Sequence, residues 1–181
     1  MKTLKLLTFL ALGTLLFNFS ACDSAKDLAD ITFDASMDAN IDAVSASETR
    51  AIGYTFSGSA IIDPTSDENI KKYWDNIKEW NIQKITVKVL EIEEDAELLQ
   101  GSLVVKDNNN QALLYTAEAE SLPLTPGTMI MEITDGDWSQ ITGALNQQHA
   151  LLASVEGALD KPDIHITLLI TIYVRVTANP L

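Results

Sequence analysis

The sequence predicts a mainly β protein of the α+β kind: an antiparallel β-sandwich or curved sheet with two packed helices. Two long segments, 30–43 and 164–177, alternate between apolar and polar residues along most of their length, which is the period of a strand with one buried face. In two shorter segments, residues typical of helix N-termini are followed by apolar residues at helical spacing. Because such long strands lie near both ends of the chain, we expect a large antiparallel sheet with one face buried.

The first strand is predicted over 30–43. Aspartates recur every four residues from Asp30 to Asp42, which would suit a helix. At about 100° per residue, however, the apolar side chains would scatter around that helix, whereas in a strand they all lie on one face. The strand is therefore the better prediction. A second alternating segment, 52–62, includes Gly58, where a bend or bulge is expected.

A first helix is predicted over Ser66–Glu79. Thr65 and Glu68 have the T-x-x-E spacing of a capping box. The apolar side chains of the segment share one helical stripe of about 120°. They are Ile70, Tyr73, Trp74, Ile77 and Trp80. Because Trp74 and Trp80 belong to this stripe, we expect them to pack between helix and sheet and not to form a sugar-stacking platform.

Several strands are predicted in the middle of the chain. They cover 85–92, 103–106, 112–120 and 128–133. The apolar phase slips after Val89, which predicts a bulge before an acidic turn at 93–97. The run Asp107-Asn108-Asn109-Asn110 suits a hairpin turn, because asparagine tolerates positive φ.

A second helix is predicted after Asp137, which with Gln140 resembles a helix cap. Its buried face would use Trp138, Ile141 and Leu145. Two further strands follow, at 151–155 and 164–177, separated by the turn Asp160-Lys161-Pro162-Asp163.

Residues 1–21 have the layout of a secretory signal peptide. Lys2 and Lys5 precede a mostly apolar run from Leu6 to Phe19. That run is shorter than the roughly 20 residues that a membrane-spanning helix needs. We therefore expect a cleaved signal and not a transmembrane helix.

The end of this segment, Phe19-Ser20-Ala21-Cys22, resembles the lipobox of bacterial lipoproteins, with phenylalanine where leucine is usual. In that family the cysteine is acylated and becomes the new N-terminus. The resemblance implies lipidation at Cys22, which is the one cysteine of the chain, and an anchor of several acyl chains, enough for stable attachment. It also implies a lipidated N-terminus and short tether at 22–29, and a place in the outer membrane of a diderm bacterium, facing the periplasm or the cell surface. The strand pattern predicts a single β-rich domain over 30–181.

Charge and composition exclude several classes of partner. The chain has 12 Lys+Arg against 26 Asp+Glu, and loss of the signal peptide leaves an excess of 16 negative charges. Nucleic-acid binding needs clustered basic residues, so we do not expect a nucleic-acid partner. We expect the protein to contact the membrane through its lipid anchor only. One Cys and two His cannot build a structural zinc site. We expect no cofactor beyond the lipid on Cys22, apart from a weakly held divalent cation.

No catalytic residue is predicted. His165 lies on the polar face of the last strand and His149 near the end of the second helix, neither beside a nucleophile motif, so we expect both to be structural. The acidic clusters at 91–97 and 135–137 do not match a calcium-binding loop and are expected to be solvated turns. A carboxylate pair of the glycosidase kind remains open, because the sequence cannot select two acids from 26.

The segment Asp63–Val89 is similar to small uncharacterised lipoproteins common in the Bacteroidetes, with a D-P turn, an I-K-K-Y helix and a K-I-T-V-K-V strand in order. That resemblance implies no activity. We predict a lipid-anchored, non-enzymatic protein of the cell envelope that acts in binding or assembly, with an envelope protein, a glycan or an apolar ligand as partner. Trp138 and Tyr173 are the aromatic candidates for a surface contact. The alternatives are a carrier of an apolar or lipid ligand in a β-lined cavity, and a hydrolase that uses a carboxylate pair.

Overall fold

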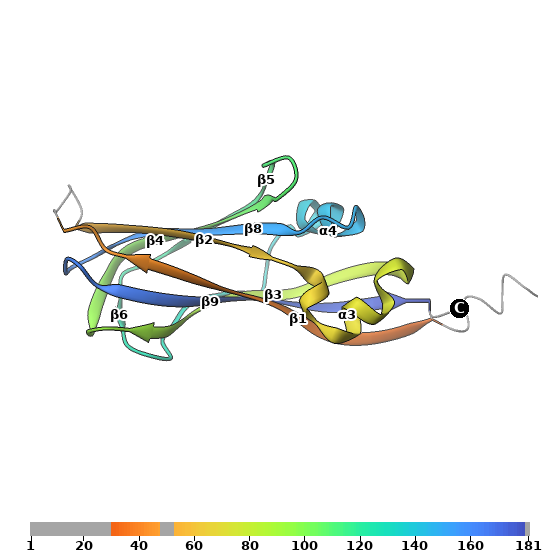
Figure 1. Cartoon of the computed structure of the whole chain (residues 1–181), viewed down its shortest axis with the longest axis horizontal. Coiled ribbons are helices and arrows are strands. Elements are labelled where there is room, and N and C mark those ends of the chain that lie inside the picture. The colour runs from red at the N-terminus through yellow and green to blue at the C-terminus, as the bar shows by residue number, and fades with distance from the viewer. Residues whose placement is uncertain (1–29, 48–52, 180–181) are drawn as a thin grey trace, which may run out of the picture.

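The computed structural model describes residues 30–47 and 53–179, which form an antiparallel β-sandwich (Figure 1). One sheet has the order β1-β9-β3-β7, and the other has the order β2-β8-β4-β5 with β6 beside β4. The strands are β1 (Ile31–Val44), β2 (Tyr54–Ile62), β3 (Ile77–Ile92), β4 (Ala96–Asp107), β5 (Leu113–Ala119), β6 (Leu122–Leu124), β7 (Met129–Ile133), β8 (Leu151–Leu159) and β9 (His165–Ala178). The helices are α3 (Glu68–Tyr73) and α4 (Ser139–Asn146). The predicted fold class is confirmed, in its sandwich form.

Strand β9 is the centre of the first sheet. It pairs with β1 in one unbroken register, from Ile31 opposite Ala178 to Val44 opposite His165, and with β3 on its other side. Every second side chain of β9, from Ile166 to Val176, is almost inaccessible to solvent. The predicted alternation of the last strand is confirmed, and its apolar face forms much of the core between the two sheets.

The bulge predicted after Val89 is also confirmed. The pairing of β3 with β9 shifts register between Val89 and Glu91. Two further shifts occur, at Ile77/Glu79 and Ile82/Lys84, and the first lies in a part of β3 that the sequence pattern assigned to a helix.

The first helix is much shorter than predicted. Instead of Ser66–Glu79, the chain forms a 3-10 turn (Pro64–Ser66), α3, a second 3-10 turn (Trp74–Asn76) and then the start of β3. The predicted cap is also wrong: Asp67 caps α3 by accepting hydrogen bonds from the amides of Asn69 and Ile70, at 2.8 and 3.0 Å.

Pairing with β9 explains this difference. Ile77 lies opposite Ala178, and Trp80 lies opposite Val176. Both residues have high strand propensity, and in β3 they gain backbone hydrogen bonds and side-chain packing with β9 that an isolated helix would lack. Trp80 is buried, and its ring meets that of Trp74 edge-on, with 6.1 Å between ring centroids. Packing of the two tryptophans is therefore confirmed, although Trp80 lies on a strand.

The second helix is confirmed, with Ile141 and Leu145 on its buried face. The Asp137 carboxylate accepts a hydrogen bond from the Ser139 amide at 3.0 Å, just before α4 begins. Among the described residues, no helix is long and apolar enough to cross a membrane. The short strand β6 was not predicted, because Pro123 is typical of a chain break; it pairs only with the start of β4, at a sheet edge where proline is tolerated.

The edges of the two sheets meet where β1 approaches β2. A Cβ atom at Gly58 of β2 would lie 2.4 Å from Ile41 Cγ2 and 2.9 Å from the Asp42 carbonyl oxygen of β1. Only glycine lets the two edge strands come this close. This corner of the sandwich is thus closed by direct contact between strands.

Candidate functional site

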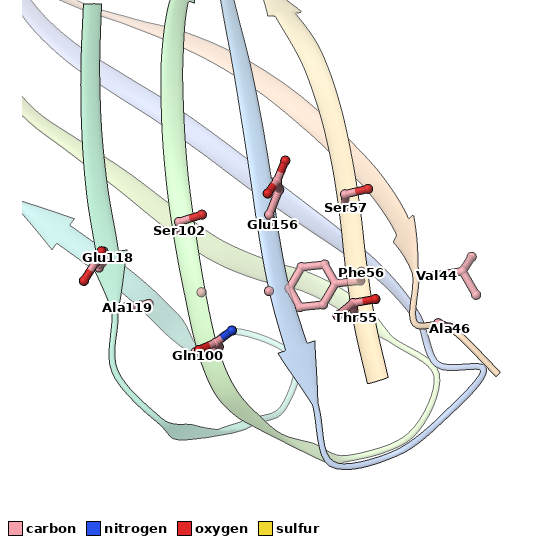
Figure 2. A pocket seen from close by; sticks show the side chains of 12 residues that line it. Val44, Ala46, Thr55, Phe56, Ser57, Gln100, Ser102, Glu118, Ala119 and Glu156 are labelled. Carbon is pink, nitrogen blue, oxygen red and sulfur yellow. The ribbon is translucent and has the colours of Figure 1, made fainter. Parts of the chain in front are cut away.

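A depression of about 650 Å³ lies at the end of the second sheet where β1 ends (Figure 2). We call it the sheet trough. It is lined by Val44, Ala46, Thr55, Phe56, Ser57, Gln100, Gly101, Ser102, Glu118, Ala119, Glu156 and Gly157. These residues come from β1, the segment after it, and the four strands β2, β8, β4 and β5. The trough is therefore assembled from parts of the chain that are distant in sequence.

Strand register places four polar side chains of the trough in one row. Ser57 lies opposite Glu156, Glu156 opposite Ser102, and Ser102 opposite Glu118. Adjacent strands lie about 4.8 Å apart, so the backbones of Glu118 and Glu156 are separated by about 10 Å, with Ser102 between them. The row offers two hydroxyl groups and two carboxylates to a ligand.

The inner side of the sheet supports the trough through Phe56. This side chain is 4% exposed, and a Cβ atom at Gly157 would lie only 2.6 Å from Phe56 Cε1. The ring therefore packs across the glycine of the neighbouring strand. This contact holds the backbones of β2 and β8 together beneath the polar row.

The chemistry of the trough suits polar or cationic groups. Glu118 and Glu156 take part in no ion pair with the residues that the structure describes. Figure 2 shows that their carboxylates do not point towards one another, which gives the hydrolase alternative no support. Half of the residues that line the trough have polar side chains, and buried apolar side chains fill the space between the sheets, so the trough gives the apolar-carrier alternative no support either.

A second feature is a histidine–carboxylate pair on the opposite part of the second sheet. His149 Nδ1 lies 2.8 Å from Asp107 Oδ2, and Asp107 Oδ1 accepts a hydrogen bond from the Asn109 amide at 2.8 Å. Asp107 is buried, with 4% of its surface exposed. The pair ties the β4–β5 hairpin to the segment between α4 and β8. His149 thus has the structural environment expected of it, but the sequence did not identify its partner.

The backbone conformation at the end of α4 positions the His149 side chain next to Asp107. Gln148 has φ of 60°, and the His149 amide donates a hydrogen bond to the Ala144 carbonyl oxygen at 3.1 Å. This is a left-handed helix cap with glutamine where glycine is common. The turn directs the next residue back towards the sheet.

We expect Asp107 to contribute stability that is lost in acid. Burial raises the pKa of this carboxyl, but the hydrogen bonds from His149 and from the Asn109 backbone outweigh it, and the net pKa lies below its ordinary range. The ionised group therefore stabilises the fold fully above about pH 4, and its contribution is lost as the pH falls through the lowered folded-state pKa. Urea denaturation of wild type and Asp107→Asn should show a gap in unfolding free energy at pH 7 that narrows towards pH 3. A gap that stays constant or widens in acid would contradict this assignment.

Several other acidic residues have structural partners. Glu94 forms an ion pair with Lys161, which also donates a hydrogen bond to the Asp95 carbonyl oxygen at 2.7 Å. On the outer face of the first sheet, Arg175 donates to both carboxylate oxygens of Asp34, at 2.8 and 3.2 Å. Within residues 30–47 and 53–179, no group of three His, Cys, Asp or Glu side chains is placed to hold a metal ion. The divalent cation remains a prediction.

The two aromatic candidates for a surface contact are both partly engaged. Trp138 is half-buried, with its ring centroid 4.9 Å from that of Tyr115. Tyr173 is 38% exposed, but the Lys84 ammonium lies over its ring, 4.9 Å from the centroid. Neither ring presents two open faces to a sugar.

The predicted lipidation site, Cys22, lies outside the described residues. His165 is exposed on β9, as expected. The sequence does not reveal the sheet trough, because the polar residues of the trough are ordinary for the outer face of a strand. The alternation of β2 and β5 indicates that Ser57 and Glu118 face outward, but nothing in it indicates that they share a row.

No protein-family model and no curated protein matches the sequence. Among solved structures, the decameric BFDV capsid protein is similar over 81% of this chain and 99% of its own, with 10% identity and a TM-score of 0.42. A mud crab tombus-like virus structure is similar over 84% of this chain and 83% of its own, with 11% identity and a TM-score of 0.39. The chain spans 38% of the infectious bursal disease virus VP2 chain, at 12% identity and a TM-score of 0.34. These are distant likenesses between β-sandwiches.

Proposed function

We propose that this protein is a lipid-anchored component of the bacterial cell envelope, attached through Cys22, whose sandwich domain acts in non-enzymatic binding or assembly. The observation that carries the binding role is the row Ser57, Glu156, Ser102 and Glu118 along the sheet trough. The anchoring role is supported by the signal-like segment and by the single cysteine at the position where the lipoprotein family attaches lipid.

The direction of β1 supports a trough held away from the membrane. Figure 1 shows that β1 starts at the end of the sandwich where α3 lies and runs to the opposite end, and Val44, its last residue, lines the trough. At about 3.3 Å per residue this strand is roughly 43 Å long. The tether at 22–29 reaches at most about 28 Å when extended. A partner would thus meet the trough on the side away from the lipid.

We expect Cys22→Ser to release the protein from the membrane fraction. The hydroxyl cannot form the thioether that carries the lipid, and the remaining chain has an excess of 16 negative charges after signal removal, which disfavours an anionic lipid surface. Palmitate labelling and fractionation of cells should show label and membrane association in wild type only. Ser20→Ala is a matched control, because it keeps the thiol and a small side chain. Palmitate labelling that survives in Cys22→Ser would refute the anchoring part.

The binding part is tested in the same cells with a photo-crosslinking residue. Placed at Ser102 in the trough, it should yield a discrete crosslinked species. Placed at Asn40, which is exposed on the outer face of the first sheet, it should yield none. Equal crosslinking at both positions would remove the trough as the binding surface.

A further inference from the structure

Strand β5 is an open edge of the second sheet. It pairs with β4 on one side, through each of its seven residues except Leu114, and with none of the described residues on the other. Figure 2 shows it as the outermost strand of its sheet at the trough, with Glu118 and Ala119 near its end. Since α4 contacts the sheet near Leu114, the accessible part of the edge is Thr116–Ala119.

The other edges of the sandwich are less available. Strands β1 and β2 approach one another at Gly58, which blocks their edges around Ile41 and Asp42. Strand β7 offers no unpaired charge, because its one charged side chain, Glu132, forms an ion pair with Lys84 at 2.7 Å. Strand β6 contains Pro123, which lacks an amide hydrogen.

The accessible part of the β5 edge has little protection against strand addition. Natural edge strands are commonly guarded by lysine, proline, a β-bulge or a covering element. In β5 the bulge and the covering helix α4 both lie at Leu114, where the pairing with β4 shifts register. Thr116–Ala119 contains neither lysine nor proline, and its one charged residue is Glu118. Its free backbone amide and carbonyl groups can therefore pair with an added strand, which would extend the sheet beside the trough.

We propose that the β5 edge binds an extended segment of a basic partner protein by strand addition, with a Lys or Arg side chain of that segment beside Glu118. The charges favour this occupant: Glu118 forms no ion pair with a described residue, and Glu156 adds a second carboxylate without an ion pair to the same trough. A second copy of this chain fits poorly, because two strongly acidic domains would repel one another. This inference rests on the proposed binding role and names its partner class; it does not depend on anchoring through Cys22.

The test uses the full chain in detergent micelles and a fluorescent heptapeptide that alternates lysine with valine, with blocked termini. We expect saturable binding, with hydrogen exchange slowed at amides within 113–119. Glu118→Lys should raise the Kd by about tenfold or more, because it places a like charge against the peptide. Asp38→Lys is the matched control: it makes the same charge change on an exposed residue of β1 and should leave the Kd within about twofold.

Two outcomes separate strand addition from charge attraction alone. The same peptide with every backbone amide N-methylated keeps its charge but has no backbone donors, so it should bind much more weakly. Equal binding of the methylated peptide, or equal losses in Glu118→Lys and Asp38→Lys, would overturn the proposal. If Ser102 crosslinks a partner in cells while no peptide protects 113–119, the binding role stands and strand addition at β5 fails.

Discussion

Replacing Ile170 with alanine should lower the unfolding free energy by about 2–5 kcal/mol, the range found when a large buried aliphatic side chain is truncated. Ile170 is completely buried at the middle of β9, opposite Ala39 of β1 and Val87 of β3. Strand β9 is held by neighbours on both sides, so the surrounding backbone cannot easily collapse into the space left by the removed methyl groups. Urea denaturation followed by tryptophan fluorescence measures the change, since Trp80 is part of the same core.

The adjacent residue provides the control. Leu169 points to the outer face of β9 and is half-buried, so Leu169→Ala removes a similar volume from a surface and not from the core. We expect a clearly smaller loss, below that of Ile170→Ala in the same experiment. Equal losses of unfolding free energy in the two variants would contradict the structure, in which Ile170 lies on the buried face of β9 and Leu169 on the outer face.

Replacing Gly58 with valine should destabilise the sandwich by about 1–3 kcal/mol or more, through overpacking. The added Cβ would meet Ile41 Cγ2 at 2.4 Å and the Asp42 carbonyl oxygen at 2.9 Å. The isoleucine side chain can turn aside, but the carbonyl belongs to the backbone of β1, so the two edge strands must separate. Thermal or urea denaturation gives the size of the effect, and faster hydrogen exchange at the end of β1 would locate it.

A second glycine, Gly143, provides a control for the Gly58→Val variant. Gly143 lies inside α4, and apart from its chain neighbours and the backbone of its own helix, a Cβ atom there would meet no described heavy atom within 4 Å. Gly143→Ala should therefore be neutral or stabilise the fold by up to about 1 kcal/mol, because alanine favours a helix. Stability unchanged by Gly58→Val would show that β1 and β2 do not touch as described.

The sequence predicted the strands best where apolar and polar residues alternate over many positions. The alternation in β1 and β9 identified both strands, and it correctly divided the buried side chains of β9 from the exposed His165 and Tyr173. It was less successful between Ser66 and Trp80, where the apolar spacing suited a helix. There the pairing of β3 with β9 decided the outcome, and that pairing depends on residues more than 90 positions later in the chain.

The candidate site could not be predicted from the sequence for the same reason. Ser57, Ser102, Glu118 and Glu156 are each an ordinary outward residue of a strand, and only the register of four strands places them in one row. The pair formed by Asp107 and His149 likewise joins a hairpin to a helix end 42 residues away.

The sequence by itself determined which face of β1 and of β9 packs towards the core, although Thr171 on the polar face of β9 is buried as well. It also placed the single cysteine at the end of a signal-like segment, because periodicity and local motifs are properties of neighbouring residues. Only the tertiary structure decided where α3 ends, how closely β1 approaches β2, and that β5 is left as an open edge beside two unpaired carboxylates. These features arise from hydrogen bonding and packing between segments far apart in the chain, and no local pattern specifies which strands become neighbours.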